Sequence, residues 1–428
     1  MSTHMRRSGR FIGVLLAVIV LVALVVFTAL RLYGASRLSR AQAAFDESTA
    51  DVQELAARIA AASAKPLEPT HNAARFLEAG ASAVIWSEED QDLVSEASLA
   101  PAREWESEQT AKLYSVISRQ EAALALLHRA ADIEQSDWGV DETRGAAAEL
   151  PDLIRLLKAA RLLLIEGRVA LADERIDDAL LSVASLSTLG ESIKQTPFLL
   201  CTLVGIAIER MELHLAGEVL GMPDLSAPQL ARLRSLAEGA PPIDTLRFGL
   251  ITETRDVRAT FQNAETPLSL RGLASIALWQ LEAASGLDDV REFLDSASVP
   301  YAQTLVTREK ASPPRASWFS RLVSGRPTTP NLKNAIARAQ SVAAERQKVL
   351  AGIAVYELAL STHYLPAARP DLPPLGEPDP LTGQPLLYER LPDGRVQIEI
   401  DGGRELLSEI IPRGATRAAR PVMLPARR

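Results

Sequence analysis

The longest run of apolar positions lies near the beginning of the chain, from Phe11 to Leu30. These residues carry no charge, and Thr28 is the only one whose side chain can donate a hydrogen bond. At about 1.5 Å of rise per residue, a helix of this length spans roughly the 30 Å hydrocarbon core of a bilayer. The pattern predicts a transmembrane helix over residues 11–30 that contacts the lipid bilayer, preceded by a cytoplasmic tail over residues 1–10.

The charges around this run do not fix its orientation, because three arginines stand on each side of it: Arg6, Arg7 and Arg10 before, and Arg31, Arg37 and Arg40 after. A short basic tail before a single apolar segment is typical of a signal anchor. We therefore expect an anchor in a bacterial inner membrane, single-pass, with the main body periplasmic. The run is longer than the apolar region of a cleavable signal peptide, which favours retention. Cleavage at the small triplet Gly34–Ser36 is the alternative.

Apolar residues recur at helical spacing through most of the remaining chain. One such set predicts a helix that leaves the membrane: Phe45, Val52, Leu55 and Ile59. A second set predicts one further helix: Leu113, Val116, Ile117, Leu124 and Leu127. Later helices are predicted at about 151–172, 175–195, 198–220, 228–238, 242–263, 268–285, 287–298 and 332–360. The pattern indicates an all-α extracytoplasmic body over residues 35–365.

Two of these helices carry small residues at positions where they would face each other. The alternation of small and large residues is typical of a tetratricopeptide-like hairpin and comprises Leu163, Gly167, Ala170, Ile176, Ala179, Leu180 and Leu186. Such repeats need several copies to bury a core, and no second copy is found at a period of 34 residues. An ordinary helical hairpin in a bundle is therefore the alternative. In the next helix, Cys201 and Gly205 stand four residues apart in an apolar run, which indicates close packing.

The segment from Arg308 to Lys333 mixes basic and aromatic residues. It contains six cations and one acid, and its candidate membrane-contact residues are Trp318, Phe319, Arg315 and Arg321. Such a segment suits an anionic membrane surface, and a solvated basic loop that tucks its tryptophan into the helical body is the alternative.

Near its C-terminal end the chain changes from helical to alternating patterns. Residues 366–380 contain six prolines and predict an extended connector. In residues 381–411, alternating apolar positions on both sides of the Pro392-Asp393-Gly394 turn predict a β-hairpin unit, which must pack on something to be stable, the preceding helix being the obvious support. Residues 412–428 hold five arginines and no acid, which predicts a basic disordered tail that is drawn to the membrane or has no role.

One short motif resembles a known family. The residues from Asp379 to Tyr388 read Asp-Pro-Leu-Thr-Gly-Gln-Pro-Leu-Leu-Tyr. They resemble the Asp-Pro-x-x-Gly-x-Pro-x-x-Tyr element of type II secretion pseudopilins and of uncharacterised membrane-anchored helical proteins of planctomycetes and myxobacteria. The segment Leu163–Leu236 is similar to the same uncharacterised group. The resemblance implies, as an alternative role, a component of a secretion or pilus-like machine, with an N-terminus processed near Gly9.

The search for chemistry is mostly negative. A net charge of −8 and a pI near 5.4 argue against a nucleic-acid partner, and one cysteine cannot form an intramolecular disulfide. The sequence contains no metal-binding, nucleophile-elbow or phosphate-binding motif, so we assign no catalytic, cofactor-binding or metal-binding residue. We interpret Glu209, Arg210 and His214 as interior or rim polar contacts. Glu209 would pair with Arg210 of a neighbouring copy or with Arg232.

These observations predict a membrane-anchored envelope protein of unknown specific function. Its body would serve as an interaction or scaffolding module for an unknown protein partner, since helical-hairpin surfaces bind partners and nothing supports catalytic turnover. The alternatives are a component of a secretion or pilus-like machine and an enzyme of unrecognised type. An enzyme would require a concave polar pocket that the sequence alone does not show.

Overall fold

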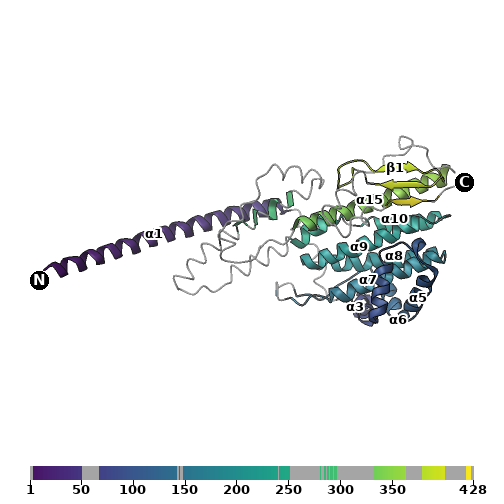
Figure 1. Ribbon diagram of the computed structural model, residues 1–428, viewed down its shortest axis with the longest axis horizontal. Coiled ribbons are helices and arrows are strands. Elements are labelled where there is room, and N and C mark those ends of the chain that lie inside the picture. Colours follow the sequence, from purple (N-terminus) through teal and green to yellow (C-terminus); the bar gives the residue numbers. More distant parts are fainter. Residues whose placement is uncertain are drawn as a thin grey trace. The chain divides into compact units, whose positions relative to one another are not determined.

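The computed structural model describes residues 3–50, 67–141, 144, 148–239, 241–250, 332–362, 378–400 and 421–425, with residue 280 and several between 284 and 295. The protein is mostly helical, with a small antiparallel sheet of three strands near its C-terminal end (Figure 1). This confirms the predicted helical class. The chain divides into two compact units, of which the first comprises residues 1–51, 254–295 and 315–329 and the second the remainder.

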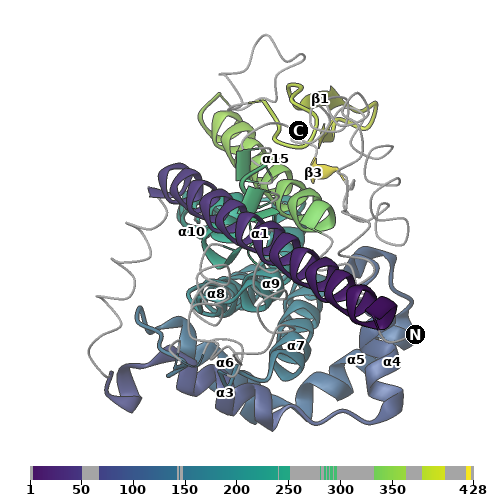
Figure 2. The ribbon, with the colours of Figure 1, turned by 90° about the vertical axis from the view of Figure 1, so that its left-hand side faces the viewer.

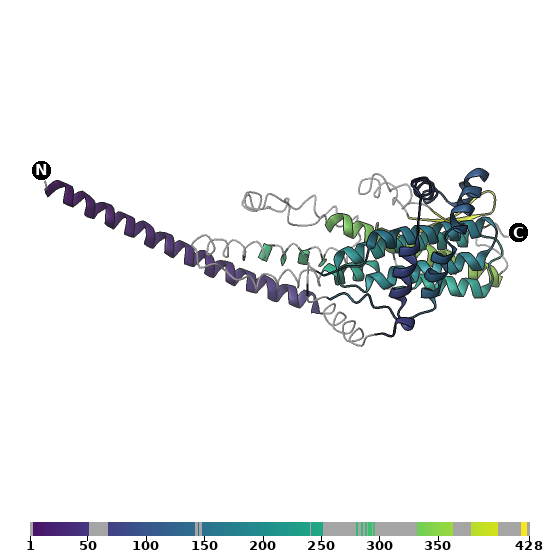
Figure 3. The same ribbon diagram turned by 90° about the horizontal axis from the view of Figure 1, so that it is seen from below.

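In the first unit, helix α1 (Thr3–Ser48) runs without interruption (Figure 3). Ala41, Phe45 and Thr49 are buried at four-residue spacing, so one face of its C-terminal part is covered. Arg37 of α1 forms a 3.3 Å ion pair with Asp288. Among the described residues, no helix meets the length and hydropathy needed to cross a membrane. The side chains of residues 3–24, which include most of the predicted anchor, lie outside the described part.

The second unit begins with short helices that sequence periodicity did not separate. They are α3 (Ala73–Ala83), α4 (Glu88–Ala97), α5 (Ser107–Ser118) and α6 (Glu121–Ala131), with short 3-10 turns at Pro69–His71 and Ala102–Glu104. The prediction of one continuous helix through Leu113 and Leu127 is wrong. Gln120 leaves helical geometry between α5 and α6, and its side chain hydrogen-bonds the backbone N and O of Ile85 at 3.2 and 2.6 Å. The chain turns there without glycine or proline.

The central helices confirm the predicted ones to within two residues. They are α7 (Leu153–Ala172), α8 (Ile176–Lys194), α9 (Leu199–Leu220) and α10 (Ala227–Ala237). The close packing predicted around Cys201 is also confirmed, since Cys201 is buried and α8 and α9 approach each other at two glycines. A Cβ atom added to Gly205 would lie 3.0 Å from the Gly190 carbonyl oxygen and would collide with the side chain of Lys194.

The helices of the second unit are stacked in layers, which Figure 2 shows nearly end-on. α3 and α6 pack against α7 and α8, and α9 contacts both α7 and α8. On its other side α9 contacts α15 (Leu332–Thr362), which also contacts α10. The core is therefore a series of helix-on-helix interfaces, and α9 contacts α7 and α8 as well as α15. Residues 242–250 are also helical, whereas most of residues 251–298 and of the connector at 366–380 lie outside the described residues.

The sheet confirms the predicted hairpin and adds a strand. β1 (Leu387–Arg390) pairs with β2 (Val396–Glu399), and β2 pairs with β3 (Val422–Leu424), both antiparallel. α15 contacts β2 and β3, as expected for the support of the hairpin. The prediction of a disordered tail is wrong for Val422–Leu424, because Val422 and Leu424 are buried. A glycine makes room for this strand, since a Cβ added to Gly352 of α15 would lie 3.1 Å from Val422 Cγ1.

The Asp-Pro-x-x-Gly motif has a local structural explanation. The carboxylate of Asp379, which is completely buried, accepts hydrogen bonds from the backbone N–H of Leu381 at 2.8 Å and of Thr382 at 3.2 Å, and from the Thr382 hydroxyl. Gly383 adopts a φ of 72°, which favours glycine, and its N–H donates to the Asp379 carbonyl at 2.7 Å. Burial raises the pKa of Asp379 despite these hydrogen bonds. The motif therefore closes a tight turn before β1.

Candidate functional site

The residues predicted to contact a membrane surface, Trp318, Phe319, Arg315 and Arg321, lie outside the described residues, and so do the arginines of the C-terminal tail. Their roles stay predictions. In the described part of the chain, charged and polar side chains gather instead at two places in the helical stack.

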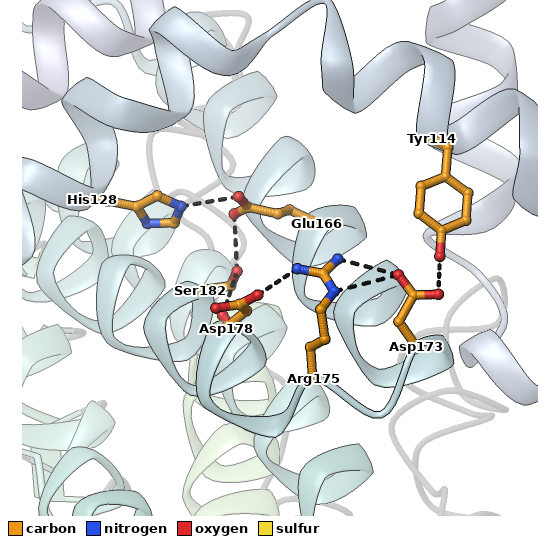
Figure 4. Close-up of polar contacts among 7 residues, drawn as sticks. All are labelled: Tyr114, His128, Glu166, Asp173, Arg175, Asp178 and Ser182. Carbon is orange, nitrogen blue, oxygen red and sulfur yellow. Dashed lines mark hydrogen bonds and ion pairs between the residues drawn. The ribbon is translucent and has the colours of Figure 1, made fainter.

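The first is a peripheral cluster at the end of the α7–α8 hairpin, shown in Figure 4. Its side chains come from α5, α6, α7, α8 and the turn between α7 and α8. It comprises Tyr114, His128, Glu166, Asp173, Arg175, Asp178 and Ser182. None of them belongs to a motif that the sequence pattern indicated as functional. The available signal was the acidic and basic sequence of the turn, Asp173-Glu174-Arg175, between two strongly periodic helices.

One half of the peripheral cluster joins α6 to the hairpin. His128 Nε2 lies 3.0 Å from a carboxylate oxygen of Glu166, whose other oxygen accepts a 2.9 Å hydrogen bond from the Ser182 hydroxyl. His128 Nδ1 lies 2.8 Å from the hydroxyl of Ser185. A Ser-His-Glu arrangement is typical of some hydrolases. However, Ser185 is completely buried and its hydroxyl also donates to the Leu181 carbonyl at 3.0 Å, so no substrate can reach it in this conformation.

The other half of the peripheral cluster ties α5 to the hairpin turn. The hydroxyl of Tyr114 donates to Asp173, and this hydrogen bond raises the pKa of Tyr114. Arg175 pairs with Asp173 at 3.3 Å and also with Asp178. The arginine side chain is half exposed, at 50%. Each charged group in this half has a partner of opposite charge within the same turn of chain, which favours a positioning role over chemistry.

The second place is a buried charge cluster at the junction of α8, α9 and α15. It comprises Glu191 and Lys194 of α8, Glu209 and Glu212 of α9, and Arg346 of α15. Lys194 Nζ lies 3.0 Å from Glu209 Oε2 and also pairs with Glu191. Arg346 pairs with the other oxygen of Glu209 and donates to the Gly239 carbonyl. The side chains of Lys194 and Glu209 are each only 2% exposed.

The prediction that Glu209 makes an interior polar contact is therefore confirmed, but the predicted partners are wrong. The carboxylate binds Lys194 and Arg346 rather than Arg210 of a neighbouring copy or Arg232. Arg346 lies 137 residues further along the chain, and periodicity carries no information about such a distant partner. Arg210 instead interacts with Glu345 of α15.

The comparisons with known proteins add no assignment to either cluster. No group of three or more His, Cys, Asp or Glu side chains in the described part of the chain is arranged to hold a metal ion. The sequence matches no protein-family model, no curated protein and no solved structure.

Proposed function

We propose that this is a membrane-anchored envelope protein whose helical stack binds a protein partner. The observation that supports the anchor is a run of large apolar side chains exposed on α1. It comprises Val25, Val26, Leu30, Leu32 and Tyr33, which are 45–67% exposed. Contiguous exposed apolar surface on a helix is typical of contact with a membrane or another protein. Val25, Val26 and Leu30 belong to the apolar segment Phe11–Leu30, and Leu32 and Tyr33 follow it, so a bilayer is the environment that fits the run.

The packing of the stack supports an interaction role. In the α7–α8 hairpin, a Cβ added to Gly167 would lie 3.1 Å from Ser182 Cβ and would collide with Leu215 of α9. This close nesting agrees locally with a tetratricopeptide-like hairpin, a class of structure whose stacked copies form extended partner-binding surfaces. The proposal does not depend on further copies of the repeat.

The peripheral cluster offers a suitable recognition surface. Tyr114 is 37% exposed and Arg175 is half exposed, and both are held by hydrogen bonds to Asp173. Tyrosine and arginine are enriched among the residues that dominate binding energy at interfaces. Side chains already fixed in the free protein lose less conformational entropy on binding. We therefore place the partner on the outer face of the α7–α8 turn and α5.

The anchor is tested by fusing alkaline phosphatase after Arg428 in a bacterial host. The phosphatase needs disulfides that form outside the cytoplasm, so we expect an active enzyme in the membrane fraction that resists extraction at alkaline pH. The control carries Leu16→Arg with Val20→Arg, which puts two charges into the apolar run and should release an inactive fusion into the soluble fraction. An inactive wild-type fusion, or a soluble product lacking the first 35 residues, contradicts the proposal.

The recognition surface is tested by placing a photo-crosslinking amino acid at position 114 in living cells. We expect one reproducible partner, and Arg175→Ala in the same chain should abolish the adduct. The control position is Arg232, an exposed residue on α10. Identical adducts at both positions, or an adduct at 114 that survives Arg175→Ala, would show that this surface does not recognise the partner.

A further inference from the structure

The buried charge cluster contains more negative than positive groups. Three carboxylates surround two cations, Lys194 and Arg346: Glu209 and Glu212 are buried, whereas the Glu191 side chain is 38% exposed. With every group ionised, the cluster carries one excess negative charge. A carboxylate in a dry interior is costly unless a cation pairs with it, so a buried carboxylate of this cluster that lacks its own cation favours the uptake of one proton.

The ion pairs single out the carboxyl group that would take the proton. Lys194 is engaged by Glu191 and Glu209, and Arg346 is engaged by Glu209 and by the Gly239 carbonyl. Glu212 follows Glu209 by one helical turn and is 5% exposed. In the described part of the chain, neither cation of the cluster lies within ion-pair distance of Glu212.

No cation on the elements packed around α9 forms an ion pair with Glu212 in their described parts. Arg168 of α7 is the cation that faces α9 from that side, and it pairs with Glu218 at 2.6 Å. On α15, Lys348 pairs with Glu345 at 2.7 Å, and Glu345 also interacts with Arg210. Arg234 of α10 pairs with Glu357 of α15 at 2.6 Å and lies 3.9 Å from Glu238, and β3 contains no charged residue.

We propose that the buried charge cluster is a proton-binding site, in which Glu212 holds one proton in the folded protein at neutral pH. Release of this proton leaves an unpaired charge between α8, α9 and α15. The packing of α15 on the other two helices is therefore sensitive to pH.

The direction of this dependence follows from the groups around Glu212. Burial raises the pKa of Glu212 well above its usual value, and the nearby Glu209 raises it further, whereas Lys194 and Arg346 act in the opposite direction. A carboxyl group whose pKa is raised on folding takes up a proton as the chain folds. Its contribution to stability is complete below the ordinary glutamate pKa, and it is lost as the pH rises through the raised value.

The proton itself is detected by infrared spectroscopy of the full-length protein in detergent micelles. The wild type at pH 7 should show the carbonyl stretch of a protonated carboxylic acid, and Glu212→Gln should lack it. On raising the pH, the wild-type band should disappear. A wild-type spectrum without such a band at pH 7, or a band that Glu212→Gln retains unchanged, overturns the proposal. If the variant does not fold, the disappearance of the wild-type band on raising the pH serves as the test by itself.

A thermal measurement tests the consequence for the helices. Between pH 5 and pH 8, the wild-type melting temperature should fall by about 3 °C more than that of Glu212→Gln. Glu121→Gln, a change at an exposed glutamate in the first turn of α6, should behave as the wild type does. Hydrogen exchange at α15, corrected for the intrinsic pH effect, should accelerate over the same interval in the wild type and in Glu121→Gln but not in Glu212→Gln. Parallel pH profiles in wild type and Glu212→Gln would refute the coupling to α15.

Discussion

The peripheral cluster and the buried charge cluster use the same kinds of side chain and share helix α8. They differ in how far their side chains are exposed to water and in the balance of their charges. In the peripheral cluster, Arg175 is half exposed and lies between two aspartates that water also solvates. In the buried cluster, Lys194 and Glu209 are almost completely removed from water. Exposed ion pairs contribute little to stability, whereas a buried ion that loses its partner is strongly destabilising. Environment, more than residue type, therefore separates the two clusters.

The largest effect is expected from removing the carboxylate that both buried cations share. Glu209→Gln keeps the shape of the side chain but removes the ion pairs of Glu209 with Arg346 and with Lys194. We expect a loss of about 3–5 kcal/mol in the free energy of unfolding, because the cations remain buried. Denaturant unfolding of the full-length protein in detergent measures it. A loss below about 1 kcal/mol would show that water reaches this cluster and would remove its distinction from the peripheral one.

The second largest effect on stability is expected where α8 and α9 approach each other beside the buried charge cluster. In Gly205→Ala the new methyl group meets the Lys194 side chain and the Gly190 carbonyl oxygen, so α8 and α9 must separate or the lysine must leave Glu209. We expect a loss of about 1–3 kcal/mol in stability. Gly190→Ala is the matched control, because its nearest neighbours lie at 3.5 Å, an ordinary contact. Equal effects of the two changes in chemical denaturation would contradict the close approach at Gly205.

A smaller effect is expected in the half-buried part of the peripheral cluster. Glu166→Gln removes the charge beside His128 Nε2 while a side-chain oxygen remains to accept from Ser182. We expect a loss of about 1 kcal/mol, typical of one hydrogen bond to a charged or polar group. The melting temperature of the full-length protein provides the measurement. A change as large as that of Glu209→Gln would show that His128 and Glu166 act as a buried pair.

The smallest effect on stability is expected at the exposed end of the same cluster. Arg175→Ala removes two ion pairs that water screens, and we expect a loss of no more than about 1 kcal/mol. The same change should abolish the crosslink at position 114, so stability and recognition are affected to different degrees. If unfolding measurements gave a loss of several kcal/mol, the turn would be a structural lock and the loss of the crosslink would not identify a contact.

The sequence predicted the helices of the central stack well, because their apolar positions keep a regular period over many residues. It did not separate α5 from α6, since the turn at Gln120 depends on a hydrogen bond to Ile85, 35 residues away. It also passed over α3 and α4, although Ser87 and Asp90 form a capping box that the sequence contains. Local patterns therefore predicted the long helices of the central stack, but not every short helix whose start is encoded locally.

The two clusters were less accessible to sequence reasoning, and for a physical reason. An acid such as Glu209 shows by its apolar neighbours that it is interior, which was predicted. Its partner is set by the packing of α15 on α9, which no short-range spacing encodes. In the same way, β3 was missed because Val422–Leu424 is too short to show alternation and lies between arginines. The strand packs at this place because Gly352 of α15 leaves room for Val422.

The position of β3 has a consequence for the order of folding. The strand packs on α9, where a Cβ added to Gly217 would lie 3.6 Å from Val422 Cγ2. The ribosome therefore synthesises α9 some two hundred residues before the strand that packs on it. While the chain is being synthesised, the apolar surface of α9 that β3 covers stays uncovered until Val422–Leu424 has been made. Contacts between such distant segments form slowly, and exposed surface of this kind promotes aggregation in the meantime. A ribosome that stops short of Pro421 would release a chain whose central stack is folded but whose α9 surface stays open, a natural target for chaperones and proteases.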